Sequence, residues 1–292
     1  MMNSHLIPVI NRQILLITGE DRHQFLQGLI TNNIFLLQSQ PALYTALLSH
    51  QGRFLHDFMI TETDHSFQLE VEKDRLDDLK KKLMIYKLRA KVDFEMTTDQ
   101  IFAYIGPLKD LDDHLKLHAY QDPRHDALGI RLILPQELCP EKLEFFDRYD
   151  QHRLMLGIPD GSRDLQPDKA IPLEYGFDAL NAIAWDKGCY LGQELTARTR
   201  HLGVIRKGLF AAKFNGISPG FNHPVYIDDQ KIGETLSWSG NHTLCRLRFE
   251  FFQKAELSEN TAVRLQYDGG TLTATRPTWR TIGQERKLSG DV

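Results

Sequence analysis

The spacing of hydrophobic residues changes along this chain and separates a first region of helices and strands from a second region of short strands. In the first region, residues 19–31 and 73–89 carry apolar residues at helical spacing and are predicted to form amphipathic helices. Thr18-Gly-Glu-Asp21 resembles a capping box and would begin the first helix. A third helix is predicted from Pro140 to about Gly157, because proline is favoured in the first turn of a helix.

Strands are predicted before and between these helices, and the first of them begins near residue 6. Residues 42–61 hold two apolar runs separated by His50-Gln-Gly-Arg53, which predicts a hairpin with Gly52 at positive φ in its turn. Alternating segments predict further strands at 67–71, 92–94, 101–105 and 128–134. The first region is therefore predicted to combine helices with antiparallel sheets.

The second region begins near residue 206, where Gly, Asn, Asp and Pro separate short alternating segments. These segments are 208–214, 225–228, 232–238, 243–249, 262–266 and 271–275. Short strands at this spacing predict a small antiparallel β-barrel. The predicted fold class is therefore α+β, with one domain over residues 1–205 and a C-terminal barrel domain over residues 206–292.

The composition agrees with two globular domains in 292 residues, since 41% of the residues are hydrophobic and 25% are charged. The net charge of −4 is mild and argues against a general nucleic-acid binder, which usually carries a strongly basic domain. No run approaches the ~18 apolar residues of a membrane span. The first ten residues lack a basic n-region and an arginine-rich presequence. The sequence predicts a cytoplasmic protein, or a mitochondrial matrix protein if a presequence has been removed.

The three cysteines, Cys139, Cys189 and Cys245, lie far apart and form no Cys-x-x-Cys pair. The chain therefore encodes neither a disulfide scaffold nor a self-sufficient zinc or iron–sulfur site. His114 and His118 are four residues apart, but no third ligand has suitable spacing, which favours a surface pair over a metal site. No dinucleotide-binding, phosphate-binding or His-Glu-x-x-His motif occurs, which removes nucleotide-dependent and zinc-hydrolase functions.

The segment with the most chemistry runs from Trp185 to Glu194, where a short apolar strand leads into Lys187-Gly-Cys189. Gly188 is expected to let the backbone turn sharply, and Gly192 to let it approach another group closely. A lysine beside a cysteine favours the thiolate, which is the form that attacks electrophiles and ligates iron. Packing of Cys189 in a core is the competing interpretation, because free cysteine is among the most buried residue types. Local chemistry leaves the two open.

Lys187-Gly-Cys-Tyr-Leu-Gly-Gln-Glu194 resembles the Lys-Gly-Cys-Tyr-x-Gly-Gln-Glu block of the YgfZ/GcvT-like folate-binding family, a branch of the folate-dependent aminomethyltransferases. Residues 195–207 look most like the mitochondrial and alphaproteobacterial iron–sulfur assembly branch of that family. Other segments are similar in the same order: Gly28-Leu-Ile-Thr-Asn32, Gln51-Gly-Arg-Phe-Leu-His-Asp57, Gly157-Ile-Pro-Asp-Gly-Ser-Arg-Asp-Leu165 and Ile171-Pro-Leu-Glu174. The resemblance covers nearly the whole chain and implies a GcvT-like folate-binding N-terminal unit.

The resemblance also implies roles for two carboxylates. Glu174 is expected to contact the pterin of tetrahydrofolate, because a carboxylate can accept two hydrogen bonds from it; a solvated loop carboxylate is the alternative. Asp57 matches the second of two adjacent aspartates that support catalysis in the true aminomethyltransferases. Here His56 replaces the first aspartate and Arg53 replaces the usual glycine, which weighs against a glycine-cleavage reaction. For Asp57 the alternative is a hairpin-end aspartate that binds backbone donors.

The residues around Cys189 receive supporting roles. Tyr190, Gln193 and Glu194 are expected to position its loop, and Glu194 could equally cap a short helix beginning near Gln193. A basic run near the predicted domain boundary could meet the glutamate tail of folate, an acidic partner or RNA phosphates, although a solvated charge run is commoner. It comprises Arg198, Arg200, His201, Arg206 and Lys207, and Tyr190 and Arg198 are the further candidates for folate contact.

Three functions are compatible with these features. The resemblance favours a folate-binding accessory factor for the maturation of four-iron cluster proteins, acting through a reactive or cluster-ligating Cys189. One cysteine cannot hold a cluster, so a partner, expected to be an A-type iron–sulfur carrier, must supply the other ligands of a shared, transient cluster. The second function is a tetrahydrofolate-dependent aminomethyl or one-carbon transferase, with Cys189 as nucleophile and Asp57 as acid–base group. The third is an accessory module for tRNA modification that binds RNA through residues 198–207.

Overall fold

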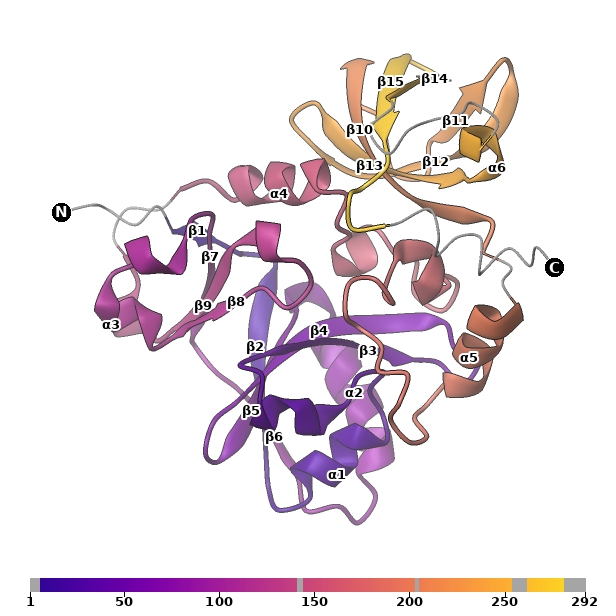
Figure 1. The fold of residues 1–292 in the computed structure, drawn as a ribbon. Coiled ribbons are helices and arrows are strands. Elements are labelled where there is room, and N and C mark those ends of the chain that lie inside the picture. The colour runs from indigo at the N-terminus through magenta and orange to yellow at the C-terminus, as the bar shows by residue number, and fades with distance from the viewer. Residues whose placement is uncertain (1–5, 141–143, 203–204, 254–261, 281–292) are drawn as a thin grey trace. The chain divides into compact units, whose positions relative to one another are not determined.

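The computed structural model describes residues 6–140, 144–202, 205–253 and 262–280 (Figure 1). They form two compact units. The first comprises Met1–His50, Leu55–Tyr149 and Leu180–Leu191, and the second comprises Gln51–Phe54, Asp150–Ala179 and Gly192–Val292. No helix in the described part of the chain is long and apolar enough to cross a membrane.

The first unit is built on two antiparallel sheets. One has the strand order β3-β4-β5-β2-β6, with β2 at Arg12–Thr18, β3 at Leu43–Leu48, β4 at Phe54–Glu62, β5 at Ser66–Glu72 and β6 at Asp93–Met96. The other has the order β1-β7-β9-β8, with β1 at Ile7–Pro8, β7 at Gln100–Tyr104, β8 at Ala119–Gln121 and β9 at Ile130–Leu134. The predicted hairpin over residues 42–61 is confirmed as β3 and β4, and Gly52 in its turn has a φ of 65°.

The five-stranded sheet has two chemically different faces, because neighbouring residues of a strand point to opposite sides. One face packs apolar residues of β2, β4 and β5 against the helices α1 (Arg22–Gln27) and α2 (Leu76–Lys87), which lie against this sheet in Figure 1. The alternate positions of the same strands include Arg12, Asp57 and Glu70, which are buried although they are charged. A buried polar face is unusual for a sheet, and it sets the environment of one predicted site residue.

The predicted helices are shorter than their apolar spacing suggested. The first spans Arg22–Gln27 instead of residues 19–31, because Ile30 leaves the helix and forms a bridge with Leu47. The capping box is wrong, since Asp21 makes no side-chain cap and its carboxylate accepts from the Lys91 backbone N–H at 2.7 Å. The helix predicted over 73–89 is a short 3₁₀ turn followed by α2.

Three further helices complete this comparison. Helix α4 spans Phe146–Met155 of the predicted 140–157, and residues 141–143 of that prediction lie outside the described residues. Helix α3 spans only Asp113–Lys116, so His114 and His118 do not share a helix. Helix α5 spans Gln193–Leu202 and confirms a helix from Gln193. Strands β2 and β8 were not predicted, because β2 is a nearly continuous apolar run and β8 has only three residues.

The second unit contains a closed barrel with the strand order β10-β13-β12-β11-β14-β15. Its strands are β10 (Lys207–Gly216), β11 (Pro224–Ile227), β12 (Gln230–Ser239), β13 (His242–Arg248), β14 (Val263–Tyr267) and β15 (Gly270–Thr275). The short helix α6 (Glu250–Gln253) lies between β13 and β14 in the chain. All the strands predicted after residue 206 are present, and the α+β class with a C-terminal antiparallel barrel is confirmed.

A buried arginine holds the non-barrel part of the second unit to the barrel. Arg153 is fully buried, and its guanidinium donates to Asp150 at 2.6 Å and to Asp164 at 2.9 Å. It also donates to Ser237 of β12 at 2.8 Å. Arg153 also donates to the Ile158 carbonyl, so the segment from Gly157 to Leu165 is ordered around one charged centre.

Candidate functional site

The three cysteines occupy different environments. Cys189 is exposed, Cys139 is partly buried and Cys245 of β13 is fully buried. Burial raises the pKa of both the Cys139 and the Cys245 thiol, which keeps them protonated. Of the three, Cys189 is therefore the thiol that a reagent, a metal cluster or a partner protein can reach, and the packed-core interpretation of Cys189 does not hold.

Lys187 anchors the loop that carries Cys189. Its ammonium is buried and donates to the backbone carbonyls of Gln27, Ile30 and Asn32 at 2.8, 2.7 and 2.7 Å. These bonds use all three donors of the ammonium group. Burial lowers the pKa of Lys187 to about 8. The sequence interpretation gave this lysine the task of favouring the thiolate; in the structure its donors are committed to positioning the loop.

Tyr190 has a second part in this anchor. Its ring is buried, and the Lys187 Nζ lies 5.1 Å from the ring centroid, a cation–π contact. The tyrosine was a candidate for folate contact and for positioning of the loop, and its contact with Lys187 is compatible with the second role. The exposed Cys189 thus lies between the buried Lys187, two positions before it, and the buried Tyr190, which directly follows it.

The segment Gly28–Asn32 forms the base on which the Cys189 loop rests. The Thr31 hydroxyl donates to the Ala182 carbonyl at 2.6 Å, and the Asn32 amide donates to the Asn181 carbonyl at 2.7 Å. Backbone bonds join Ala184 N–H to the Thr31 carbonyl and Leu191 N–H to the Gly28 carbonyl, both at 3.1 Å. The sequence identified this segment as a family landmark and assigned it no task. Only contacts between residues some 150 positions apart reveal it.

The two glycines of the motif, Gly188 and Gly192, differ in whether the backbone requires a glycine at their position. Gly192 has a φ of 81°, and a Cβ on Gly52 would lie 2.9 Å from the Gly192 carbonyl oxygen, so the expected close approach is confirmed. Gly188 is not at positive φ, and a Cβ on it would meet no atom within 4 Å. The chain bends at residues 185–187, directly before Gly188, and the bend does not require a positive φ at this glycine. Nothing in the described chain requires glycine there, and its effect is to leave the backbone next to Cys189 bare.

Asp57 is closed in by its own chain. Its carboxylate accepts from the Arg12 guanidinium at 3.3 and 3.4 Å and from the Tyr44 hydroxyl at 2.8 Å, and all three side chains are buried. Burial, with Asp57 as the next cause, raises the pKa of Tyr44 well above its usual value. The donors are side chains and not the backbone groups considered above. An acid–base role would require Asp57 to leave a charged partner.

The same polar face continues into residues that the sequence did not single out. Arg131 donates to Glu70 at 2.6 Å, and Glu70 accepts from Tyr120 at 3.2 Å. Arg124 donates to Asp122 at 2.7 Å and to Tyr149 at 2.6 Å. The Arg131 Nη1 is buried and makes no hydrogen bond within the described residues. Alternation within β5 and β9 could have suggested buried charges, but their pairing needs the fold.

Glu174 lies in a 3₁₀ turn over Pro172–Tyr175 of the second unit. Its Oε2 accepts from Arg246 of β13 at 2.8 Å, and Arg246 also contacts Glu234. Burial raises the pKa of Glu174 despite the neighbouring arginine. The side chain is part-buried and ion-paired, so it is not a solvated loop carboxylate. Its Oε1 has no hydrogen-bond partner in the described part of the chain.

The remaining candidates lie on or near α5. Gln193 is the first residue of this helix, and Glu194 is exposed in its first turn, where a carboxylate interacts favourably with the helix dipole. Arg198, Arg200, His201 and Arg206 are exposed. Lys207 is partly buried and lies 3.6 Å from Glu234, so it does not belong to a free basic run.

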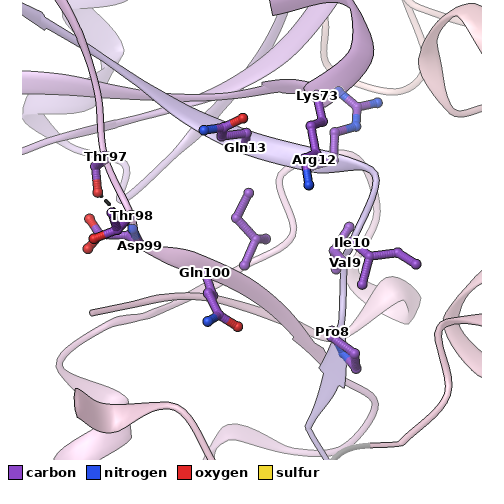
Figure 2. A pocket seen from close by; sticks show the side chains of 11 residues that line it. Pro8, Val9, Ile10, Arg12, Gln13, Lys73, Thr97, Thr98, Asp99 and Gln100 are labelled. Atoms are coloured by element: carbon purple, nitrogen blue, oxygen red, sulfur yellow. Dashed lines mark hydrogen bonds between the residues drawn. The ribbon is translucent and has the colours of Figure 1, made fainter. Parts of the chain in front are cut away.

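A cavity of about 330 Å³ lies elsewhere in the first unit. Figure 2 shows its lining, with Thr97, Thr98 and Asp99 on one side and Arg12 and Lys73 on another. Among the candidate residues none lines it, although Arg12 joins it to Asp57. No group of three metal-ligating side chains occurs among the described residues.

Comparisons with known proteins decide the family. The chain is 35% identical over 272 residues to the iron–sulfur cluster assembly factor IBA57, mitochondrial, of Mus musculus, covering 82% of this chain and 76% of that protein. It is 34% identical over 268 residues to the Homo sapiens protein of the same name, covering 81% and 75%. This chain belongs to the IBA57 family. The resemblance to the iron–sulfur assembly branch of the YgfZ/GcvT-like proteins is therefore confirmed.

Other similarities agree with this family. An IBA57 homologue of Neurospora crassa is 35% identical over 231 residues, which are 70% of this chain; the chain spans about half of that protein, 53%. Residues 206–282 match the CAF17 C-terminal β-barrel domain. The crystal structure of the glycine cleavage system aminomethyltransferase T of Bartonella henselae has a TM-score of 0.71 at 14% identity, covering 94% of this chain and 86% of that one. At that identity it supports the GcvT-like fold alone.

Proposed function

We propose that this protein serves iron–sulfur cluster assembly by presenting Cys189 as a cluster ligand to a partner protein that supplies the other thiolates. The observation that carries the proposal is the exposure of Cys189 on a loop whose neighbours, Lys187 and Tyr190, are buried. Protein-bound iron–sulfur clusters take several thiolates, so one fixed, accessible thiol suits a shared cluster. The names of the IBA57 relatives support the assembly role, and an A-type iron–sulfur carrier remains the expected partner.

The surroundings of the thiol support presentation to a large visitor. Bare backbone at Gly188 allows another protein to approach the sulfur closely. The anchor formed by Lys187 and the Gly28–Asn32 segment holds the loop before a partner arrives, which reduces the entropy that binding must overcome. A nucleophilic enzyme would also need a base that activates the thiol. No such base contacts Cys189 among the described residues.

The test is complementation in cells that lack the native gene. We expect Cys189→Ser to abolish maturation of four-iron enzymes, measured as aconitase-type activity against protein level, and Cys139→Ser to retain it. In vitro, the wild-type protein mixed with a cluster-loaded A-type carrier is expected to form a heterodimer whose cluster absorbance Cys189→Ser loses. Full maturation by Cys189→Ser would refute the proposal, and a carrier complex that keeps its cluster without the thiol would refute the shared ligation.

We further propose that the protein binds a reduced folate, with Glu174 accepting hydrogen bonds from the pterin. Glu174 suits such a group in chemistry, because it is part-buried and its Oε1 has no hydrogen-bond partner among the described residues. When bound, folate would supply a one-carbon carrier. The closure of Asp57 by Arg12 and Tyr44 disfavours the one-carbon transferase.

Titration of tetrahydrofolate into the full-length protein tests this second proposal. A dissociation constant of ~10 μM corresponds to roughly 7 kcal/mol, of which one bidentate contact would supply about 2–3 kcal/mol. Glu174→Gln is therefore expected to weaken binding by roughly 30-fold or more. Glu234→Gln is the control, because Glu234 shares Arg246 but is not the proposed acceptor. Equal effects of both variants would assign the loss to Arg246, and no binding by the wild type would reject folate.

The compartment of this protein can be proposed from the names of its relatives. The cytoplasmic assignment stays a prediction, whereas the relatives named above are mitochondrial and favour the matrix alternative. Either compartment keeps thiols reduced, as a ligating Cys189 requires.

A further inference from the structure

The side of α2 that faces away from the core carries apolar residues that neither the fold nor the proposed function uses. Met84, Ile85 and Leu88 are 48%, 69% and 87% exposed. Met84 and Ile85 lie in the last turn of α2, and Leu88 directly follows the helix, four and three positions later. The opposite side of α2 packs into the core through its leucines. We call Met84, Ile85 and Leu88, with their basic neighbours, the α2 patch.

Leu88 is held in a conformation that its residue type rarely adopts. It ends α2 with a φ of 43° and a ψ of −108°. A bulky residue at positive φ is strained, and such strain clusters where a surface has a task beyond folding. Glycine takes a positive φ without this cost, so the backbone here does not call for a leucine. The fold therefore gains nothing from leucine at this position.

The patch is basic in an otherwise acidic protein. Residues 80–91 contain six lysines and arginines and no carboxylate, whereas the whole chain has a net charge of −4. Three of the six form ion pairs, namely Lys82 with Asp78, Lys87 with Asp93 and Lys91 with Glu20. Within the described residues, Lys80, Lys81 and Arg89 have no carboxylate partner. The unpaired charges call for an anionic counterpart.

We propose that the α2 patch binds an anionic lipid surface. Basic residues around protruding apolar side chains are the composition of interfacial helices, whose apolar residues enter the headgroup boundary while lysine and arginine meet lipid phosphates. Side chains 69% and 87% exposed stand clear of their neighbours, which suits a deformable lipid layer better than a preformed protein groove. A second copy of the chain would bring like charges together. This inference is independent of the proposed function.

Flotation with vesicles tests the inference in the full-length protein. Vesicles of equal parts phosphatidylglycerol and phosphatidylcholine are expected to carry the wild-type protein, pure phosphatidylcholine vesicles are not, and added salt should weaken binding. The double variant Ile85→Ser/Leu88→Asn should lower the partition coefficient by roughly tenfold or more, as should Lys80→Glu/Lys81→Glu/Arg89→Glu. A thermal unfolding curve of each variant, compared with that of the wild type, separates a loss of lipid binding from a loss of folding.

Leu117→Ser is the matched control, because Leu117 is also 87% exposed but lies outside the patch. It should bind vesicles as the wild type does, which would support a specific patch. The inference is overturned if the wild type ignores anionic vesicles, if it binds neutral vesicles equally, or if Leu117→Ser loses binding as the patch variants do. Binding of the patch to a soluble acidic protein without any vesicle binding would likewise overturn it.

Discussion

Two predicted site residues of the first unit, Cys189 and Asp57, end in opposite situations. Cys189 is exposed, and the hydrogen bonds around it belong to its neighbours, chiefly Lys187. Asp57 is buried, and its own carboxylate receives Arg12 and Tyr44. In both places a buried cation donates hydrogen bonds to oxygen atoms. Near Cys189 these oxygens are backbone carbonyls, which leaves the thiol accessible, whereas at Asp57 they are the carboxylate oxygens themselves. A reactive residue type therefore indicates a site only when its polar atoms are left unpaired.

The largest effect on the free energy of unfolding is expected from breaking the buried ion pair between Arg12 and Asp57. Arg12→Met would leave the Asp57 carboxylate buried with a tyrosine but no cation, and breaking one side of a buried ion pair costs about 3–5 kcal/mol. Chemical denaturation should show this loss in the free energy of unfolding. The double variant Arg12→Met/Asp57→Leu should recover much of it, because neither charge is then left alone. A loss below about 1 kcal/mol for the single variant would show that the pair is solvated.

The second effect is a pH dependence at His56, the neighbour of Asp57. Burial, assisted by Arg75, lowers the pKa of His56 to about 4, and its ring lies 2.9 Å from Asp78. The unfolded chain takes up a proton near pH 6.5 and the folded one does not, so stability is present above 6.5 and is lost as the pH falls toward 4. The loss amounts to about 3 kcal/mol.

Denaturation curves from pH 7.5 to 4 check this prediction, with His56→Gln as the variant that removes the titrating group. A stability profile that is the same in wild type and variant would contradict a neutral, buried His56. A slope that remains in both would belong to other groups of the chain.

A smaller effect is expected from releasing the Cys189 loop. Lys187→Met would leave the carbonyls of Gln27, Ile30 and Asn32 without their donor, at a cost of about 2 kcal/mol. The unfolding free energy and the rate of Cys189 alkylation should both change, because the loop loses its position. Lys187→Arg, which keeps the charge but not the geometry, separates anchoring from electrostatics. An unchanged alkylation rate in both would remove Lys187 from the site.

The smallest effect on the free energy of unfolding is expected from a substitution in the exposed Cys189 loop. Gly188→Ala should fold as the wild type and gain about 0.4–1 kcal/mol, since its φ and its surroundings accept alanine. The added methyl group stands beside the thiol, so the complex with a cluster-loaded carrier is expected to weaken while alkylation by a small reagent persists. Size-exclusion chromatography with absorbance detection checks the complex. Undiminished assembly would mean that the bare backbone has no part in approach.

The sequence by itself determined much of this protein, wherever the information is local. Alternation between Gly-, Asn- and Asp-rich turns predicted each strand of the barrel, because a strand's two faces are written in neighbouring residues. The hairpin with Gly52 at positive φ and the helix from Gln193 were equally local. The Lys187–Glu194 motif indicated the family correctly, since that resemblance is carried by consecutive residues.

Only the tertiary structure decided which polar atoms are paired. Lys187 lies two positions from Cys189, yet its donors bind carbonyls of residues 27–32, some 150 positions away. Arg12 reaches Asp57 across 45 positions, and Glu174 meets Arg246 across 72. No local period encodes such partners, because they depend on which strands and loops become neighbours after folding. Exposure of a thiol and closure of a carboxylate are therefore properties of the fold, although the sequence names both residues.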